Sequence, residues 1–144
     1  MKPYALKVIP PEDVFLFGKI KKAIEDLPHV NLGRDEKGRE IELSCHMLAR
    51  AVAKFFPVRV RDGFYGGTFS HSWVVTENGH LIDIYPVATI GGPILIDGSP
   101  GAPSRKLYRS APRSYNGEFG KAWFVRSAHL VKKELARTMA RLGL

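Results

Sequence analysis

Three residues have the types and the chain order that thiol catalysis requires: Cys45, His71 and Asp83. A thiol attacks a carbonyl group well only as the thiolate, and a neighbouring imidazole can take its proton. A carboxylate bonded to the far nitrogen of that imidazole fixes the ring tautomer and stabilises the protonated ring. Each residue alone is more often structural, but the three together favour nucleophilic catalysis.

Cys45 lies at the start of a helix that we predict over residues 44–56. Ser44 suits the N-cap, and Pro57 ends the pattern. In the first turn a cysteine is close to unpaired backbone N–H groups and the positive end of the helix dipole, which lower its pKa. Apolar residues follow Cys45 along one helix face: Leu48, Ala49, Val52, Ala53 and Phe56.

His71 and Asp83 fall on two predicted antiparallel strands, over residues 69–76 and 80–85. Side chains alternate between the two faces along each strand, so the length of the connecting loop decides whether the imidazole and the carboxylate meet. A strand over 58–65 precedes them and completes a meander.

The loop contains Asn78 and Gly79. A two-residue loop would place the imidazole and the carboxylate on opposite faces, whereas a three-residue loop beginning at Glu77 makes them diagonal neighbours on one face. Three-residue hairpin loops commonly end in a residue with positive φ, which suits glycine, so we predict the longer loop. Trp73 and Tyr85 then share this face, and we take them as substrate-binding candidates.

The remaining pattern predicts a single α+β domain over residues 1–144, with an antiparallel sheet packed on the Cys45 helix. Flanking helices are predicted over residues 11–27 and from Ser127 to the C-terminus, the latter preceded by a short strand over 121–126. Residues 91–120 are rich in Gly, Pro and Ser, and we expect a flap or long loop that covers the site.

The composition is that of an ordinary globular domain, with 44% hydrophobic and 25% charged residues. It excludes disordered, collagen-like and disulfide-scaffold proteins. Cys45 is the only cysteine, so no intrachain disulfide forms, and the N-terminus lacks a secretory-signal pattern. We therefore expect a cytoplasmic protein that needs no cofactor and does not associate with membranes.

Three short motifs resemble the transglutaminase-like branch of the papain-like cysteine protease superfamily. They are Leu43-Ser44-Cys45 at a helix start, His71-Ser72-Trp73 on a strand, and Leu81-Ile82-Asp83 shortly before Pro86. The resemblance covers roughly residues 41–86. It implies a papain-like core, a Cys45 nucleophile, a His71 base, an orienting Asp83 and a thioester intermediate. Members of this superfamily include proteases, amidases, deamidases and transglutaminases, which act on amide or ester bonds.

The sequence departs from the family pattern beside the nucleophile, because His46 follows Cys45 where the family has Trp or Gly nearby. The backbone N–H of Cys45 is one candidate oxyanion donor, and Asn31, Ser44 and Tyr85 are candidates for the second. A zinc site built from Cys45, His46, His71 and Asp83 is a further interpretation, although no zinc-motif spacing is present.

The chain is basic, with 22 Lys and Arg against 14 Asp and Glu and a formal net charge of +8. This excess favours acidic partners, so we expect a peptide or protein substrate of acidic character. The alternative hypothesis is a catalytically inactive homologue that binds nucleic acid or an acidic protein. Its candidate surface combines basic and aromatic residues of the flap: Arg105, Lys106, Tyr108, Arg109, Arg113 and Tyr115.

Overall fold

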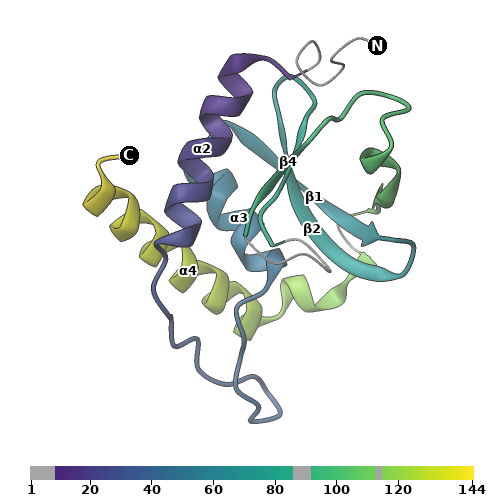
Figure 1. Cartoon of the computed structure of the whole chain (residues 1–144). Coiled ribbons are helices and arrows are strands. Elements are labelled where there is room, and N and C mark those ends of the chain that lie inside the picture. The colour runs from purple at the N-terminus through teal and green to yellow at the C-terminus, as the bar shows by residue number, and fades with distance from the viewer. Residues whose placement is uncertain (1–8, 86–91, 113–114) are drawn as a thin grey trace.

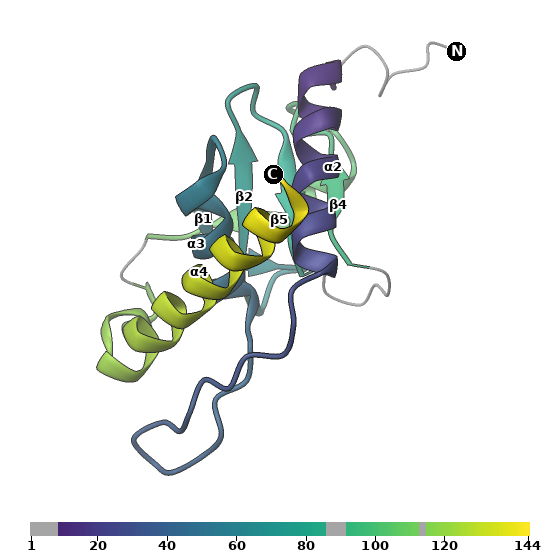
Figure 2. The same cartoon turned by 90° about the vertical axis from the view of Figure 1, so that its left-hand side faces the viewer.

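The computed structural model describes residues 9–85, 92–112 and 115–144 of the chain. In these residues three α-helices accompany a five-stranded antiparallel sheet, which confirms the expected α+β class. Figure 1 and the perpendicular view in Figure 2 show the helices together on one side of the sheet. The connection between the first two helices extends away from this body in both views.

The first helix, α2 (Pro11–Glu25), begins where the sequence predicts it. Pro11 occupies the first helical position, where its missing N–H costs no hydrogen bond. Asp13 is buried and accepts hydrogen bonds from Thr76 Oγ1 at 2.7 Å and from Asn78 Nδ2 at 3.0 Å. These bonds attach α2 to the hairpin that contains His71.

The second helix, α3 (Cys45–Phe55), has the predicted Ser44 at its N-cap, where the Ser44 hydroxyl accepts from the backbone N–H of Met47 at 3.4 Å. Its buried face packs against the sheet and the third helix. The apolar stripe therefore sets the rotation of α3, and the N-cap sets its first residue. Together they place Cys45 at the first helical position.

The third helix, α4 (Ala122–Leu142), corrects two predictions. Residues 121–126 do not form a strand, and Ser127 is not a cap but lies in the second turn, where its hydroxyl donates to the Trp123 carbonyl at 2.7 Å. The helical spacing of buried residues begins before Ser127, and this longer stripe outweighs the local strand preference of the aromatic residues. The stripe comprises Phe124, Ser127, Ala128, Val131, Leu135 and Thr138.

The sheet has the strand order β4-β3-β2-β1-β5. Its strands are β1 (Val58–Tyr65), β2 (Phe69–Thr76), β3 (Leu81–Asp83), β4 (Ile94–Ile96) and β5 (Tyr108–Ser110). The predicted meander is confirmed, and β1 and β2 have the predicted bounds. Residues 92–112, which belong to the expected flap, instead contribute both edge strands, because β4 pairs with β3 and β5 pairs with β1.

Gly63 permits the close approach of β5 to β1. A Cβ atom at this position would lie 2.0 Å from the carbonyl oxygen of Arg109, so only glycine fits. The approach pairs Tyr65 with Tyr108 at the end of the ladder. Tyr108, which the sequence places in a loop, is thereby positioned close to the strands that contain His71 and Asp83.

Two clusters of buried side chains form the core. The larger lies between the helices and the sheet and includes Val52, Val74 and Leu135. The smaller contains Trp73, Leu81 and Ile96, with Tyr108 packed against it. Because Trp73 and Val74 are neighbours on one strand, both faces of the central sheet are covered. None of the helices in the described part of the chain has the length and apolar composition that crossing a membrane requires.

Candidate active site

The loop between β2 and β3 has the predicted length. Val74 pairs with Ile82, so Trp73 lies opposite Asp83 in the same register, and the Thr76 backbone N–H donates to the His80 carbonyl at 2.8 Å. The last loop residue, glycine 79, has a φ of 85°, as expected for a residue in the left-handed region. This register makes His71 and Asp83 diagonal neighbours on one face.

The two side chains meet as the sequence predicts. Nε2 of His71 lies 2.9 Å from each carboxylate oxygen of Asp83, and both residues are almost completely buried. Asp83 also accepts a hydrogen bond from the Tyr108 hydroxyl at 2.6 Å and one from the backbone N–H of Tyr85 at 3.2 Å. These donors compensate for the burial of a carboxylate, which would be costly without them.

The environment of His71 favours its protonated form. Burial would lower the pKa of the ring, but the hydrogen bond to Asp83, a further hydrogen bond to Cys45 and the negative charges of both partners raise it to about 9. Because Nε2 is bonded to Asp83, Nδ1 is the ring nitrogen left for the sulfur.

Cys45 is half-buried at the N-terminus of α3. Burial would raise the pKa of the thiol, but hydrogen bonds with His46 and His71 and the charges of the two rings lower it to about 6. The unpaired N–H groups of the first helical turn favour the same anionic form. With the thiol pKa at about 6 and the His71 pKa at about 9, a thiolate and an imidazolium coexist between these pH values.

The sequence prediction missed two residues of the site. One, Tyr108, contacts Asp83, and the other, His46, influences the Cys45 thiol. Tyr108 was expected on a loop surface, whereas its hydroxyl is buried against Asp83, and burial followed by this hydrogen bond raises its pKa. Its three-residue strand left no periodic signal, so its partner could be found only from the folded sheet. His46 was considered only as a zinc ligand, and its position next to Cys45 was the signal that could have identified it.

The substrate-binding candidates have different environments. Trp73 is only 2% exposed and packs edge-on against Tyr108 at 5.1 Å between ring centroids. Trp73 therefore packs against the rings of His71 and Tyr108 and offers almost no surface to a substrate, which corrects the prediction for this residue. Tyr85 is 55% exposed next to the Asp83 carboxylate, so its predicted contact with a substrate stays a prediction. Pro86, part of the family motif, lies outside the described residues.

A cleft of about 370 Å³ opens beside the N-terminus of α3. Its lining includes Ser44 and His46, the two chain neighbours of Cys45, and the long connection between α2 and α3 forms one of its sides. The floor is apolar, and the remaining lining residues are mostly acidic or polar. Apolar residues are Ile41, Met47, Phe119, Trp123 and Phe124, and acidic residues are Asp35, Glu40, Glu42 and Glu118.

Most of these carboxylates are not neutralised within the described part of the chain. Asp35 is paired with Arg39 at 3.0 Å, whereas no ion pair to Glu40, Glu42 or Glu118 is found among residues 9–85, 92–112 and 115–144. The cleft beside Cys45 is therefore locally acidic in a basic protein. A cleft of this charge favours neutral or basic groups, whereas the net charge of the chain favours acidic ones.

The other sequence-based interpretations receive less support. In the described residues, no three His, Cys, Asp or Glu side chains are arranged to hold a metal ion. Asn31 and Ser44, two oxyanion candidates, accept hydrogen bonds from nearby backbone N–H groups through their side-chain oxygens, at 3.0 and 3.4 Å. The backbone N–H of Cys45, at the first helical position, is the candidate donor closest to the reacting sulfur in the chain.

Both described tyrosines of the proposed nucleic-acid surface are half-buried and hydrogen-bonded to residues of the sheet. Tyr108 donates to Asp83, and the Tyr115 hydroxyl bonds to Ser70 Oγ at 2.6 Å and to the Gly63 carbonyl at 3.2 Å. Neither ring lies free as a stacking platform. Arg113, another part of this surface, lies outside the described residues.

No family model matches the sequence, and neither a curated protein nor a solved structure is significantly similar to the chain.

Proposed function

We propose that this protein is a thiol-dependent hydrolase or acyl transferase that acts on an amide or ester bond. The observation that supports this function is the hydrogen-bonded series of Cys45, His71 and Asp83, with the sulfur at a helix N-terminus. Nucleophile, base and orienting carboxylate are thus connected in the order that nucleophilic catalysis requires. The papain-like, transglutaminase-like fold is part of the same proposal, supported by the helix-borne cysteine and the neighbouring His and Asp strands.

In the first half-reaction the Cys45 thiolate attacks the carbonyl carbon and forms the C–S bond of a tetrahedral oxyanion. Backbone N–H groups at the start of α3 stabilise this oxyanion. The intermediate collapses when the C–N or C–O bond breaks, and the His71 imidazolium gives its proton to the leaving amine or alcohol. The products of this step are a thioester on Cys45 and a neutral His71.

In the second half-reaction neutral His71 takes a proton from water or from an amine as that nucleophile attacks the thioester carbonyl. The C–S bond breaks, Cys45 leaves as the thiolate, and the ion pair is restored. Asp83 stays ionised throughout and keeps Nε2 of His71 protonated, so that Nδ1 exchanges the proton. Water as the acceptor makes the protein a hydrolase, and an amine makes it a transferase.

We place the substrate, a peptide or protein segment, in the cleft beside Cys45. An extended segment can lie on its apolar floor, and the carboxylates Glu40, Glu42 and Glu118 favour neutral or basic residues next to the scissile bond. This assignment replaces the acidic substrate that the net charge of the chain suggests.

Alkylation of the single cysteine tests the proposal without knowledge of the natural substrate. The rate constant for iodoacetamide should reach half its plateau near pH 6, because the thiol pKa is about 6. A second rise should follow near pH 9, where His71 loses its proton and the thiolate becomes more nucleophilic. His71→Ala should move the first midpoint to roughly pH 8.5, the ordinary thiol value, or higher.

Acylation by a p-nitrophenyl ester measures the chemistry itself. Wild-type protein should release a burst of p-nitrophenol and gain one acyl group on Cys45, and Cys45→Ala should do neither. His129→Ala, an exposed histidine on α4, is the matched control and should behave as wild type. A wild-type labelling midpoint near pH 8.5 together with no acyl transfer would rule out the enzyme and leave the binding module.

A further inference from the structure

A second imidazole, that of His46, follows Cys45 directly in the chain, and its hydrogen bond and charge lower the pKa of the thiol. Nδ1 of His46 is 2.6 Å from the Ser72 hydroxyl, which in turn donates to Oδ1 of Asp62 at 2.5 Å. Ser72 is completely buried and Asp62 is 7% exposed. The histidine that departs from the family pattern is thus connected to a buried carboxylate through one hydroxyl group.

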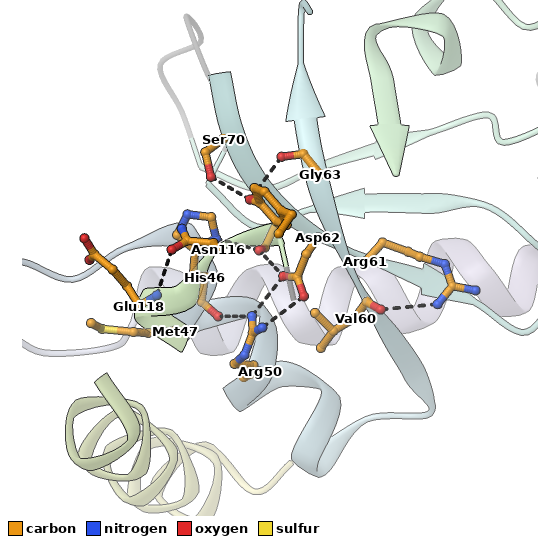
Figure 3. Close-up of polar contacts among 12 residues, drawn as sticks. His46, Met47, Arg50, Val60, Arg61, Asp62, Gly63, Ser70, Asn116 and Glu118 are labelled. Carbon is orange, nitrogen blue, oxygen red and sulfur yellow. Dashed lines mark hydrogen bonds and ion pairs between the residues drawn. The ribbon is translucent and has the colours of Figure 1, made fainter. Parts of the chain in front are cut away.

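Arg50 connects the two ends of this network, Asp62 and His46. Its guanidinium group donates two parallel hydrogen bonds to the Asp62 carboxylate, each 3.0 Å long, and a third of 3.0 Å to the backbone carbonyl of His46. Figure 3 shows these bonds between α3 and β1. The guanidinium also lies over the Phe119 ring at 4.4 Å, and the His46 ring contacts the same phenylalanine at 4.8 Å. The position of the His46 ring is therefore fixed from several directions.

The tautomer of His46 follows from counting protons. Asp62, paired with Arg50, acts as an acceptor only, so the single hydroxyl proton of Ser72 points to Asp62. The Ser72 oxygen can then only accept from His46, which requires a proton on Nδ1 of the ring. The network thereby fixes a proton on Nδ1 and leaves Nε2 of the ring for the sulfur.

We propose that His46 is a positioning residue for Cys45: the chain of Ser72, Asp62 and Arg50 holds the protonated Nδ1 of His46, so Nε2 is a second hydrogen-bonding partner of the sulfur besides His71. In its imidazolium form the ring donates from Nε2 to the thiolate. This inference rests on the proposed function, because it concerns the same nucleophile. Strand β2 supplies both supports, since Ser72 and His71 are adjacent and point to opposite faces. The two imidazoles that lower the pKa of this thiol are held by separate hydrogen-bond networks.

The groups that influence this sulfur come from three elements. His46 belongs to α3, His71 to β2, and Tyr115 to the segment before η3 (Gly117–Gly120). Behind them, Asp83 supports His71, and the Asp62–Arg50 pair supports His46 through Ser72. A test must therefore separate the contribution of His46 from that of His71.

The pH profile of iodoacetamide labelling in full-length variants makes this separation. His46→Ala should raise the labelling midpoint by roughly one pH unit, as expected for the loss of one charge-assisted hydrogen bond. The rate above pH 10, where the thiol is ionised in any case, should stay close to that of wild type. The backbone carbonyl of residue 46 remains as a partner of Arg50, so the local fold keeps this bond.

His46→Gln is the conservative variant, because its longer side chain brings an amide nitrogen near the position of Nε2, where it can donate to the sulfur. It should bring the midpoint part of the way back to that of wild type. His129→Ala is the control and should leave the midpoint unchanged. A midpoint in His46→Ala that equals that of wild type, or a labelling rate that increases equally at every pH, would overturn the inference.

The outcomes for the two histidines distinguish this inference from the proposed function. If His71→Ala shifts the midpoint and His46→Ala does not, the inference fails and the proposed function stands. If only His46→Ala shifts it, His46 activates the thiol and the role of His71 as the base fails. If neither shifts it, both fail.

Discussion

The two imidazoles beside Cys45 are held in different ways. His71 is buried and bonded directly to the Asp83 carboxylate, which has no cationic partner other than this ring among the described residues. His46 is half-buried, and its carboxylate, Asp62, is one hydroxyl group away and already paired with Arg50. The first arrangement stabilises a positive charge on the ring, whereas the second fixes the orientation of the ring.

The difference suggests how one sulfur can use two histidines without competition. A carboxylate that is free of other cations raises the pKa of His71, so His71 holds the exchangeable proton. An arginine already balances the charge of Asp62, so this carboxylate orients His46 and Ser72 through hydrogen bonds. In the proposed mechanism the proton then moves on the His71 side, and His46 holds the sulfur in place from the other side.

Asp83→Asn should break the first arrangement with the largest effect. The amide would donate to Nε2 of His71, force the proton onto Nδ1 and leave no nitrogen to accept the thiol proton. We expect acylation of Cys45 by a p-nitrophenyl ester to fall by about 10³–10⁴-fold, as in other triads with a wrong imidazole tautomer. The His71 pKa, followed by NMR, should fall from about 9. An acylation rate within a factor of ten of wild type would contradict a direct role of this carboxylate.

Asp62→Asn should break the second arrangement chiefly through stability. It leaves the mostly buried guanidinium of Arg50 without its carboxylate, which should lower the free energy of unfolding by about 3 kcal/mol. The labelling midpoint of Cys45 should move by less than about one unit, because Asp62 acts on the sulfur only through Ser72 and His46. Urea denaturation measures the first effect and iodoacetamide labelling the second.

The control for Asp62→Asn is Asp35→Asn, which breaks an ion pair whose arginine is largely exposed. Such a pair contributes little to stability, so this variant should unfold close to wild type. Equal losses of stability in the two variants would show that the Asp62–Arg50 pair behaves like an ordinary surface pair.

Most of the His71 arrangement could be predicted from the sequence, and most of the His46 arrangement could not. The pairing of His71 with Asp83 depends on side-chain alternation and on a glycine that suits a three-residue loop, and both are local properties. The Tyr108 bond depends instead on a short edge strand, and Phe124 belongs to a helix that local preference alone would have started later, at Ser127. Such features are decided by packing between distant segments, which leaves no period in the sequence.

The contact between Ser72 and Asp62 was accessible in principle. The same reasoning applied to the hairpin of β1 and β2 makes these two residues direct neighbours across the ladder, as the structure shows. The direction of the His46 ring, however, depends on how α3 rests on the sheet and on the contact with Phe119. The sequence therefore shows that His46 is next to Cys45, but only the tertiary structure shows that Ser72 and Asp62 hold its ring.

The pH dependence of stability should show that the His71 side carries a charge. The folded pKa of His71 is raised to about 9 from 6.5. Its contribution to the free energy of unfolding is therefore complete below pH 6.5 and is lost as pH rises through 9. The folded pKa of Cys45 is lowered to about 6 from 9.0, so its contribution is full above pH 9 and is lost as pH falls through 6. Between pH 6.5 and 9 the two changes oppose each other, and wild-type stability should be nearly flat.

Cys45→Ala removes one of these opposing contributions. His71 keeps the Asp83 carboxylate, so the unfolding free energy of this variant should decrease with rising pH, by up to about 1.4 kcal/mol per pH unit, above pH 6.5. Urea denaturation at several pH values gives the slope. Parallel curves for the variant and wild type would show that the thiolate–imidazolium pair does not form.

The smallest expected effect concerns the direction from which reagents reach the sulfur. The His46 side opens on the acidic cleft, whereas the protein as a whole has a net charge of +8. We therefore compare labelling by the cationic aminoethyl and the anionic sulfonatoethyl methanethiosulfonates, using glutathione to correct for their intrinsic reactivities. The cation should react several-fold faster with Cys45 after this correction, and the preference should shrink at high salt.

Combined Glu40→Gln, Glu42→Gln and Glu118→Gln substitutions should remove the preference for the cation, because the local carboxylates cause it. The same three changes at exposed carboxylates away from the cleft, Glu12→Gln, Glu25→Gln and Glu77→Gln, match the change in net charge and should leave the preference intact. A corrected preference for the anion in wild type would mean that the overall charge governs access. The sulfur would then be approached from a side other than the cleft that His46 lines.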